Sequence, residues 1–221
     1  MDKNIVFVSD FDGTITKEDF FKMVTTRLLT PAAMAPWDEY LAGRITHVQA
    51  LNGIFGQVHL TKTELDDFIA QISVDEYFYP TVDFCKSHNI PLYICSAGSR
   101  YYIERKMGAY LKDSGITLLA NGGSYSQDTG LSLIPPPPSD PFYSENLGVS
   151  KELLVQHLKE RGYTVIYAGD GKPDLQAAQA ADVVFAKDAL LALCRETGLK
   201  TENFDSFKDI LGYMEGIYAA E

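Results

Sequence analysis

Apolar and polar positions along the chain follow two different periods, and these predict two kinds of structure. Residues 4–9 form a short apolar run, which predicts a buried strand. From residue 16 to about residue 74 apolar positions recur at helical spacing, and no strand-like run interrupts them. We therefore expect four helices in a row, packed as a compact insert after the first strand.

Threonines mark the predicted starts of three of these helices. Thr16, Thr46 and Thr61 are each followed three residues later by Asp, Gln or Glu, which resembles a capping box. This interpretation assigns Asp19 to the third position of the first box. The remaining helix of the insert is expected over residues 33–42.

Strands and helices alternate through the rest of the chain, as is typical of a parallel sheet with helices on both faces. The predicted fold class is α/β. A Rossmann-like sheet is built from residues 1–15 and 75–221, and a small helical bundle is inserted at 16–74. A hairpin is expected near 123–134. Further strands are expected at 91–95, 117–120, 164–168 and 183–186. Further helices are expected at 79–86, from the residues after 96–99 to about 111, at 150–161, near 175, at 189–197 and at 207–218.

The charge and composition exclude several kinds of partner. A formal net charge of −11 repels nucleic acid and anionic membrane surfaces, so neither is expected. No apolar run approaches the ~20 residues of a membrane span, and the N-terminus lacks the basic region of a signal peptide. Three widely spaced cysteines indicate neither disulfides nor a zinc site, and a reducing cytoplasm is expected. The prolines at 135–138 are interpreted as a rigid loop, with a docking site for a proline-reading domain as the alternative. Nothing in the sequence predicts an oligomeric state.

Carboxylates cluster at the ends of predicted strands. Asp10 and Asp12 follow the first strand, and Asp170 and Asp174 follow the strand at 164–168. In a parallel sheet these ends share one edge, where ligands bind. Four carboxylates gathered there would repel one another unless a cation lay among them, and oxygen ligands suit Mg²⁺. For Asp174, the alternative is a plain turn residue.

A second strand end predicts a place for phosphate. Ser96, Ala97 and Gly98 offer a small hydroxyl and unhindered N–H groups, which we expect at a helix N-terminus. Lys151 lies in the first turn of a predicted helix. It is interpreted either as the charge that compensates phosphate and aspartates or as a solvated surface lysine.

The motifs DFDGT, SAGS, an isolated lysine and GDGKPD, in this order, resemble those of the haloacid dehalogenase-like phosphatases. The resemblance runs from Asp10 to Lys187, and the helical insert resembles the cap domain of that family. It implies that Asp10 is a nucleophile that forms an aspartyl-phosphate. It also implies that Asp12 protonates the leaving oxygen and then deprotonates the hydrolytic water. A carboxylate nucleophile divides hydrolysis into two easier steps.

The same resemblance implies the other roles in the site. Mg²⁺ is held by Asp10, Asp170 and the carbonyl of Asp12, and Asp174 supports this metal shell. Phosphate is held by Ser96, Ala97, Gly98 and Lys151. The expected function is the Mg²⁺-dependent hydrolysis of a small phosphorylated metabolite.

Three further residues are candidates for contact with the substrate. Asp19 lies where an acidic residue of phosphoserine phosphatases meets the substrate's amino group, although a helix cap is favoured here. Arg100 follows the predicted phosphate site and is equally well explained by solvent exposure. Phosphoserine phosphatases usually carry a carboxylate-binding arginine near the position of Asn52, and Arg44 is the nearest candidate here.

The segments DFDGTIT and VVFAKDALLALCRETGL look closer to the methionine-salvage phosphatases of the family. Those members act on 2-hydroxy-3-keto-5-methylthiopentenyl phosphate. Phosphoserine and phosphocholine or phosphoethanolamine are the alternative substrates. An alternative of another class is a non-catalytic phospho-receiver or binding module. Asp12 discriminates between these classes, because an acid two residues after the nucleophile serves turnover.

Overall fold

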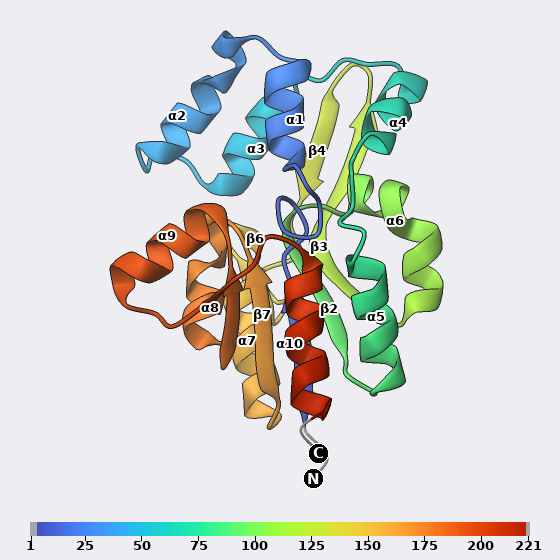
Figure 1. Cartoon of the computed structure of the whole chain (residues 1–221). Coiled ribbons are helices and arrows are strands. Elements are labelled where there is room, and N and C mark those ends of the chain that lie inside the picture. The colour runs from blue at the N-terminus through green and yellow to red at the C-terminus, as the bar shows by residue number, and fades with distance from the viewer. Residues whose placement is uncertain (1–3, 220–221) are drawn as a thin grey trace.

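The computed structural model describes residues 4–219 and has a seven-stranded sheet at its centre (Figure 1). The strand order is β4-β3-β2-β1-β7-β8-β9, and every neighbouring pair is parallel except β3 and β4. The predicted α/β class and parallel sheet are therefore confirmed. The strands are β1 (Ile5–Ser9), β2 (Leu92–Ser99), β3 (Thr117–Ser126), β4 (Gly130–Ile134), β7 (Thr164–Gly169), β8 (Val183–Ala186) and β9 (Glu202–Asn203), and a small separate ribbon contains β5 (Tyr143–Ser144) and β6 (Gly148–Val149).

Helices cover both faces of the sheet, so its central strands are apolar on both sides. In β1, Phe7 packs into one core with helices α5, α6 and α10, whereas Val6 and Val8 pack into the other with α7, α8 and α9. No helix in residues 4–219 is long and apolar enough to cross a membrane. These helices are α5 (Phe78–Ser87), α6 (Arg100–Ser114), α7 (Lys151–Glu160), α8 (Leu175–Ala180), α9 (Asp188–Thr197) and α10 (Phe207–Ala219), with a 3₁₀ turn at Lys172–Asp174.

The insert after β1 forms a cap that lies over one end of the sheet (Figure 1). Its helices are α1 (Phe20–Arg27), α2 (Ala35–Leu41), α3 (His47–Phe55) and α4 (Lys62–Ala70), with a 3₁₀ turn at Pro31–Met34. Thr46 and Thr61 form the predicted capping boxes of α3 and α4.

The predicted capping box at Thr16 is wrong. Thr16 is buried, and its hydroxyl bonds to the carbonyls of Phe11 and Glu18. The helix begins at Phe20, and Asp19 is itself the N-cap, accepting bonds from two backbone N–H groups. Thr16 instead pairs with Val74 in an isolated antiparallel bridge. This bridge joins the segment that enters the cap to the segment that leaves it.

The hairpin of β3 and β4 rises from the sheet into the cap (Figure 1). Its turn lies at residues 127–129, within the hairpin expected near 123–134. The side-chain amide of Asn52 on α3 exchanges two hydrogen bonds with the backbone of Leu133, and the Tyr125 hydroxyl donates to the carbonyl of Leu60. The hairpin therefore contacts both the sheet and the cap helices.

Candidate active site

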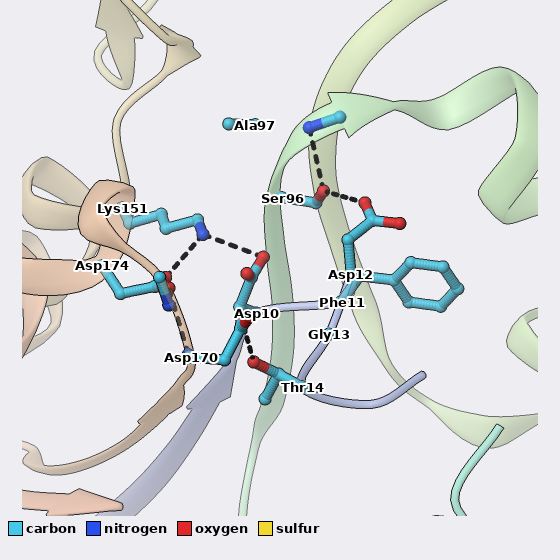
Figure 2. A network of polar contacts seen from close by, with 12 residues as sticks. Asp10, Phe11, Asp12, Gly13, Thr14, Ser96, Ala97, Lys151, Asp170 and Asp174 are labelled. Carbon is cyan, nitrogen blue, oxygen red and sulfur yellow. Dashed lines mark hydrogen bonds and ion pairs between the residues drawn. The ribbon is translucent and has the colours of Figure 1, made fainter. Parts of the chain in front are cut away.

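Three strand ends bring the predicted site residues together at one edge of the sheet (Figure 2). Strand β1 pairs in parallel with β2 on one side and with β7 on the other, so that Ser9 lies opposite Ile94 and Ala168. The chain continues from β1 into Asp10 and from β7 into Asp170, and Ser96 lies within β2 near its carboxyl end. Pairing in register thus places residues that are far apart in the sequence around one cavity.

Lys151 is the central cation of this edge. Its Nζ lies 2.8 Å from Oδ1 of Asp10 and 2.5 Å from Oδ1 of Asp174, and its side chain is 3% exposed. Ser150 caps helix α7 and so places Lys151 at the first position of that helix. Burial lowers the pKa of Lys151, but the two carboxylates outweigh it and raise the pKa above the usual value. The interpretation as a solvated surface lysine is therefore wrong.

Asp174 is fully buried and held by protein donors on both oxygens. Oδ1 accepts from Lys151 and from the hydroxyl of Tyr167 at 2.5 Å. Oδ2 accepts from the N–H groups of Gly171 and Asp170 at 2.9 and 3.2 Å. The alternative of a plain turn residue is wrong, because this carboxylate fixes both the lysine and the loop that carries Asp170.

The carboxylates of Asp10, Asp170 and Asp174 offer oxygens that lie within 4.8 Å of one another. Burial raises the pKa of Asp10 well above its usual value, against the opposing charge of Lys151. Burial, and then the charge of Asp174, raise the pKa of Asp170 to about 7. Burial is the main cause of both shifts, and the neighbouring carboxylates add to it. Hard oxygen donors gathered in this way fit a divalent cation.

The loop after β1 is shaped around Asp170. The hydroxyl of Thr14 donates to Asp170 at 2.9 Å. Gly13 has a φ of +73°, and a Cβ atom there would lie 2.3 Å from an oxygen of Asp170. Glycine is therefore required at this position both by its backbone conformation and by the space available.

Asp12 faces the other side of the cavity and is held from three directions. The N–H of Phe20 donates to Oδ1 at 3.3 Å, and the hydroxyls of Ser96 and Tyr102 donate to Oδ2. Burial, and then the charge of Asp19, raise the pKa of Asp12 to about 7, while the Tyr102 hydrogen bond opposes this shift. A carboxyl group with a pKa near neutrality is suited to both giving and taking a proton.

The segment Ser96-Ala97-Gly98 borders the cavity, but not at a helix N-terminus as predicted. It continues strand β2, and helix α6 begins only at Arg100, with Ser99 as its N-cap. The pairing of β2 with β3 shifts between Ser96 and Ser99, which bends the strand at this point. The Ser96 hydroxyl accepts from the N–H of Gly98 at 3.0 Å.

A cavity of about 230 Å³ lies between the strand ends and the cap. The core side of its lining carries the aspartates, Ser96, Ala97, Gly98 and Lys151. The cap side is mostly aromatic and apolar, and it also contains Asp19. Asp19 is thus both a helix cap and a lining residue, and burial raises its pKa. The other cap residues in the lining are Phe21, Trp37, His47, Leu51 and Phe55.

Two predicted substrate candidates do not reach this cavity. Arg44 is exposed and forms a salt bridge with Glu39. Arg100 pairs with Glu104 and donates to the carbonyl of Leu118. Each arginine is paired locally and neither lines the cavity, so the structure gives no support to a substrate contact by either residue.

Several other cavity residues carry no clear functional signal in the sequence. His47 is 7% exposed, and its Nδ1 has no hydrogen-bond partner among the described residues. Burial, and then the charge of Lys151, lower the pKa of His47 to about 4, so the ring is neutral. Trp37 and Tyr102 had been indistinguishable from core residues. His47 is the exception, because it directly follows the capping residue Thr46 and could therefore be placed at the start of a cap helix from the sequence.

A model of the haloacid dehalogenase-like hydrolase family matches residues 7–179 of the chain. The 2-hydroxy-3-keto-5-methylthiopentenyl-1-phosphate phosphatase of Geobacillus kaustophilus is 31% identical over 218 residues, covering 97% of each chain. A family hydrolase from Salmonella enterica serovar Typhi has a TM-score of 0.71 at 20% identity, covering 95% of this chain and 70% of that one. A substrate-bound phosphoserine phosphatase structure has a TM-score of 0.68 at 16% identity, covering 96% and 98%. The chain therefore belongs to the haloacid dehalogenase-like hydrolases, within their phosphatases, as its four sequence motifs predicted.

Proposed function

We propose that the protein hydrolyses a small phosphomonoester with Mg²⁺ through a phosphorylated Asp10. The observation that carries this proposal is the placement of Asp10 and Asp12 on two sides of one cavity. Asp10 is paired with Lys151 there, and Asp12 is held by donors of its own. A nucleophile and a separate acid are both needed for turnover. A phospho-receiver has no use for the second group.

In the first step, Asp10 attacks phosphorus and the bond from phosphorus to the leaving oxygen breaks. Asp12 gives that oxygen its proton. In the second step, Asp12 takes a proton from water as the water attacks the phosphorylated Asp10 and releases phosphate. Lys151, Ser96 and Ala97 border the same cavity, and we propose that the lysine, the hydroxyl and the Ala97 N–H group stabilise charge on the phosphoryl oxygens, whereas the N–H of Gly98 donates to the Ser96 hydroxyl.

Asp10, Asp170 and the carbonyl of Asp12 are the proposed ligands of Mg²⁺, and Asp174 supports them. When bound, the cation lowers the repulsion between the carboxylate nucleophile and the phosphate oxygens. The surplus of carboxylates over cations at this edge supports the assignment. A cytoplasmic location remains a prediction of the sequence.

The proposed substrate is the methionine-salvage ester on which the Geobacillus relative is named as acting. The cap side of the cavity supports this choice, because Phe21, Trp37 and Leu51 offer apolar surface to a methylthio end. Among the described residues, the cap contributes no lysine or arginine to the lining. A substrate carboxylate, as in phosphoserine, would therefore meet no positive charge on that side.

A second candidate substrate is phosphocholine or phosphoethanolamine. Asp19 and Trp37 both line the cavity, and a carboxylate and an aromatic face each attract an amine cation. This candidate differs from the first in the charge of the leaving group. The two are therefore separable by direct comparison of the esters.

The test is a release assay for phosphate over a panel that contains these esters and phosphoserine. Wild type is compared with Asp10→Asn, with Mg²⁺ or EDTA. We expect the wild type to release phosphate with Mg²⁺ but not with EDTA. Asp10→Asn should lose turnover while its circular dichroism spectrum still shows the folded state. Stable phosphorylation of the wild type by a small phosphodonor, without release, would favour the receiver instead.

A further inference from the structure

We propose that the Tyr102 hydroxyl is a positioning group, which holds the Asp12 carboxyl in the orientation from which it protonates the leaving oxygen. This inference rests on the proposed function, because it assigns the acid role to Asp12. Tyr102 lies on α6, 90 residues after Asp12 in the chain. Its hydroxyl donates to Oδ2 of Asp12, and its side chain is 2% exposed.

The two oxygens of Asp12 are bound from two different parts of the molecule. Oδ1 accepts from the N–H of Phe20, the first residue of the cap helix α1, at 3.3 Å. Oδ2 accepts from Tyr102 on the core helix and, at 3.4 Å, from Ser96. Rotation of the carboxyl group breaks both sets of bonds. Without the tyrosine hydroxyl, only two long bonds would oppose that rotation.

The tyrosine ring is itself fixed in place. It stacks on the ring of Phe20 with centroids 4.1 Å apart and is tilted against Phe11 at 6.4 Å. A Cβ atom at Gly98 would lie only 1.8 Å from the Tyr102 hydroxyl oxygen. Strand β2 thus leaves room for this hydroxyl at the point where it meets Asp12. Phenylalanine would satisfy the ring contacts, so packing does not explain the hydroxyl.

The proposed role fits the chemistry of the first step. As the bond from phosphorus to the leaving oxygen breaks, the proton passes from Asp12 to that oxygen, and Asp12 is left as a carboxylate. The hydroxyl of Tyr102 donates to this carboxylate and neither gains nor loses a proton. A correctly placed proton donor matters most for an alkoxide leaving group. It matters little for a nitrophenolate, which leaves without protonation.

The experiment compares two esters, the best alkyl phosphate of the substrate panel and 2,4-dinitrophenyl phosphate. The measured quantity is the ratio of their kcat/KM values, alkyl over aryl, because kcat/KM covers the steps up to departure of the leaving group. In Tyr102→Phe we expect this ratio to fall by about 10- to 100-fold, a large share of what a general acid contributes. Tyr101→Phe is the matched control, since its ring lies under Arg105, and we expect an unchanged ratio.

Gly98→Ala is a second variant. It keeps the tyrosine, but its Cβ displaces the Tyr102 hydroxyl and also lies 2.8 Å from Oδ2 of Asp12, so the contact between the two groups is disturbed from both sides and a fall in the ratio is expected. Any loss of phosphate binding affects both esters and cancels in the ratio. An unchanged ratio in both variants, with wild-type hydrolysis intact, overturns this inference alone. A wild type that hydrolyses neither ester overturns the proposed function, and this inference with it.

Discussion

The Nζ of Lys151 lies 2.8 Å from Oδ1 of Asp10, at a point where both side chains are almost completely shielded from solvent. A buried ion pair of this kind is strongly destabilising when one partner is removed, because the other charge is left without compensation. Here two carboxylates, those of Asp10 and Asp174, depend on the same ammonium group.

Lys151→Met is expected to lower the free energy of unfolding by about 3–5 kcal/mol, as for other broken buried pairs. It should also reduce kcat at least 100-fold, as removal of a charge-stabilising donor does. Urea unfolding and phosphate release measure the two effects. Lys159→Met is the control, because its partner Asp182 is 35% exposed. Its expected cost is at most about 1 kcal/mol. Equal costs in the two variants would contradict the buried pairing.

The raised pKa of Asp12 predicts a pH dependence of stability in the metal-free protein. The folded protein binds the proton with a pKa of about 7, whereas the unfolded chain releases it near pH 4. The folded state therefore gains stability from this proton below about pH 4. This gain is lost as the pH rises through 7.

Asp12→Asn removes this group, so it isolates the contribution. Between pH 5 and pH 8 in EDTA, the unfolding free energy of the wild type should fall by about 2 kcal/mol more than that of the variant. This is less than the full shift would give, because Asp12 borders the cavity. Denaturant titrations at both pH values measure it. Parallel pH profiles for the two proteins would refute the raised pKa.

Mg²⁺ should stabilise the wild type against heat, because a cation bound only by the folded state shifts the unfolding equilibrium. At about 100 times the dissociation constant the gain is about 2.7 kcal/mol. Asp170→Asn should remove most of this stabilisation. Asp113→Asn, at an exposed position near the end of α6, should keep it. Thermal unfolding with and without Mg²⁺ decides between them, and an equal response of all three proteins would exclude Asp170 as a ligand.

Trp37→Ala should raise KM for the preferred ester about tenfold, which corresponds to about 1.4 kcal/mol of lost contact. The ring lies 4.4 Å from that of Phe21, and both residues line the cavity. Inhibition by inorganic phosphate should not change, because the proposed phosphate-binding residues lie on the core side of the cavity. Arg44→Ala should leave KM within about twofold of wild type, since it lies outside the cavity. Steady-state kinetics test all three statements, and a larger effect of Arg44→Ala than of Trp37→Ala would reverse the assignment.

The sequence predicted the sheet, the order of its helices and the gathering of the aspartates. These features follow from local patterns, because a short apolar run between turn residues predicts a buried strand and its end. The parallel arrangement then brings Asp10 and Asp170 to one edge without further information. Successive residues of β1 are buried in the two different cores, one on each face of the sheet, as expected for a sheet covered by helices on both faces.

Other parts of the site depend on contacts between distant segments, and sequence alone could not predict them. Nothing local distinguishes Tyr102, which bonds to Asp12, from Tyr101, which lies under Arg105. The capping pattern at Thr16 was misleading because burial of its hydroxyl against Phe11 outweighed the local preference. Arg44 was proposed for its charge, and the salt bridge with Glu39 became visible only in three dimensions.

The bonding of Asn52 to Leu133 also affects how this chain meets other copies of itself. Strand β4 is one edge of the sheet, and an open edge is a template on which another chain can add a strand and aggregate. The Asn52 amide accepts from the Leu133 N–H at 2.6 Å and donates to the Leu133 carbonyl at 3.1 Å. It thus occupies the N–H and the carbonyl of Leu133, which an incoming strand could otherwise bond. A single side chain of the cap therefore protects this part of the sheet from intermolecular β-pairing.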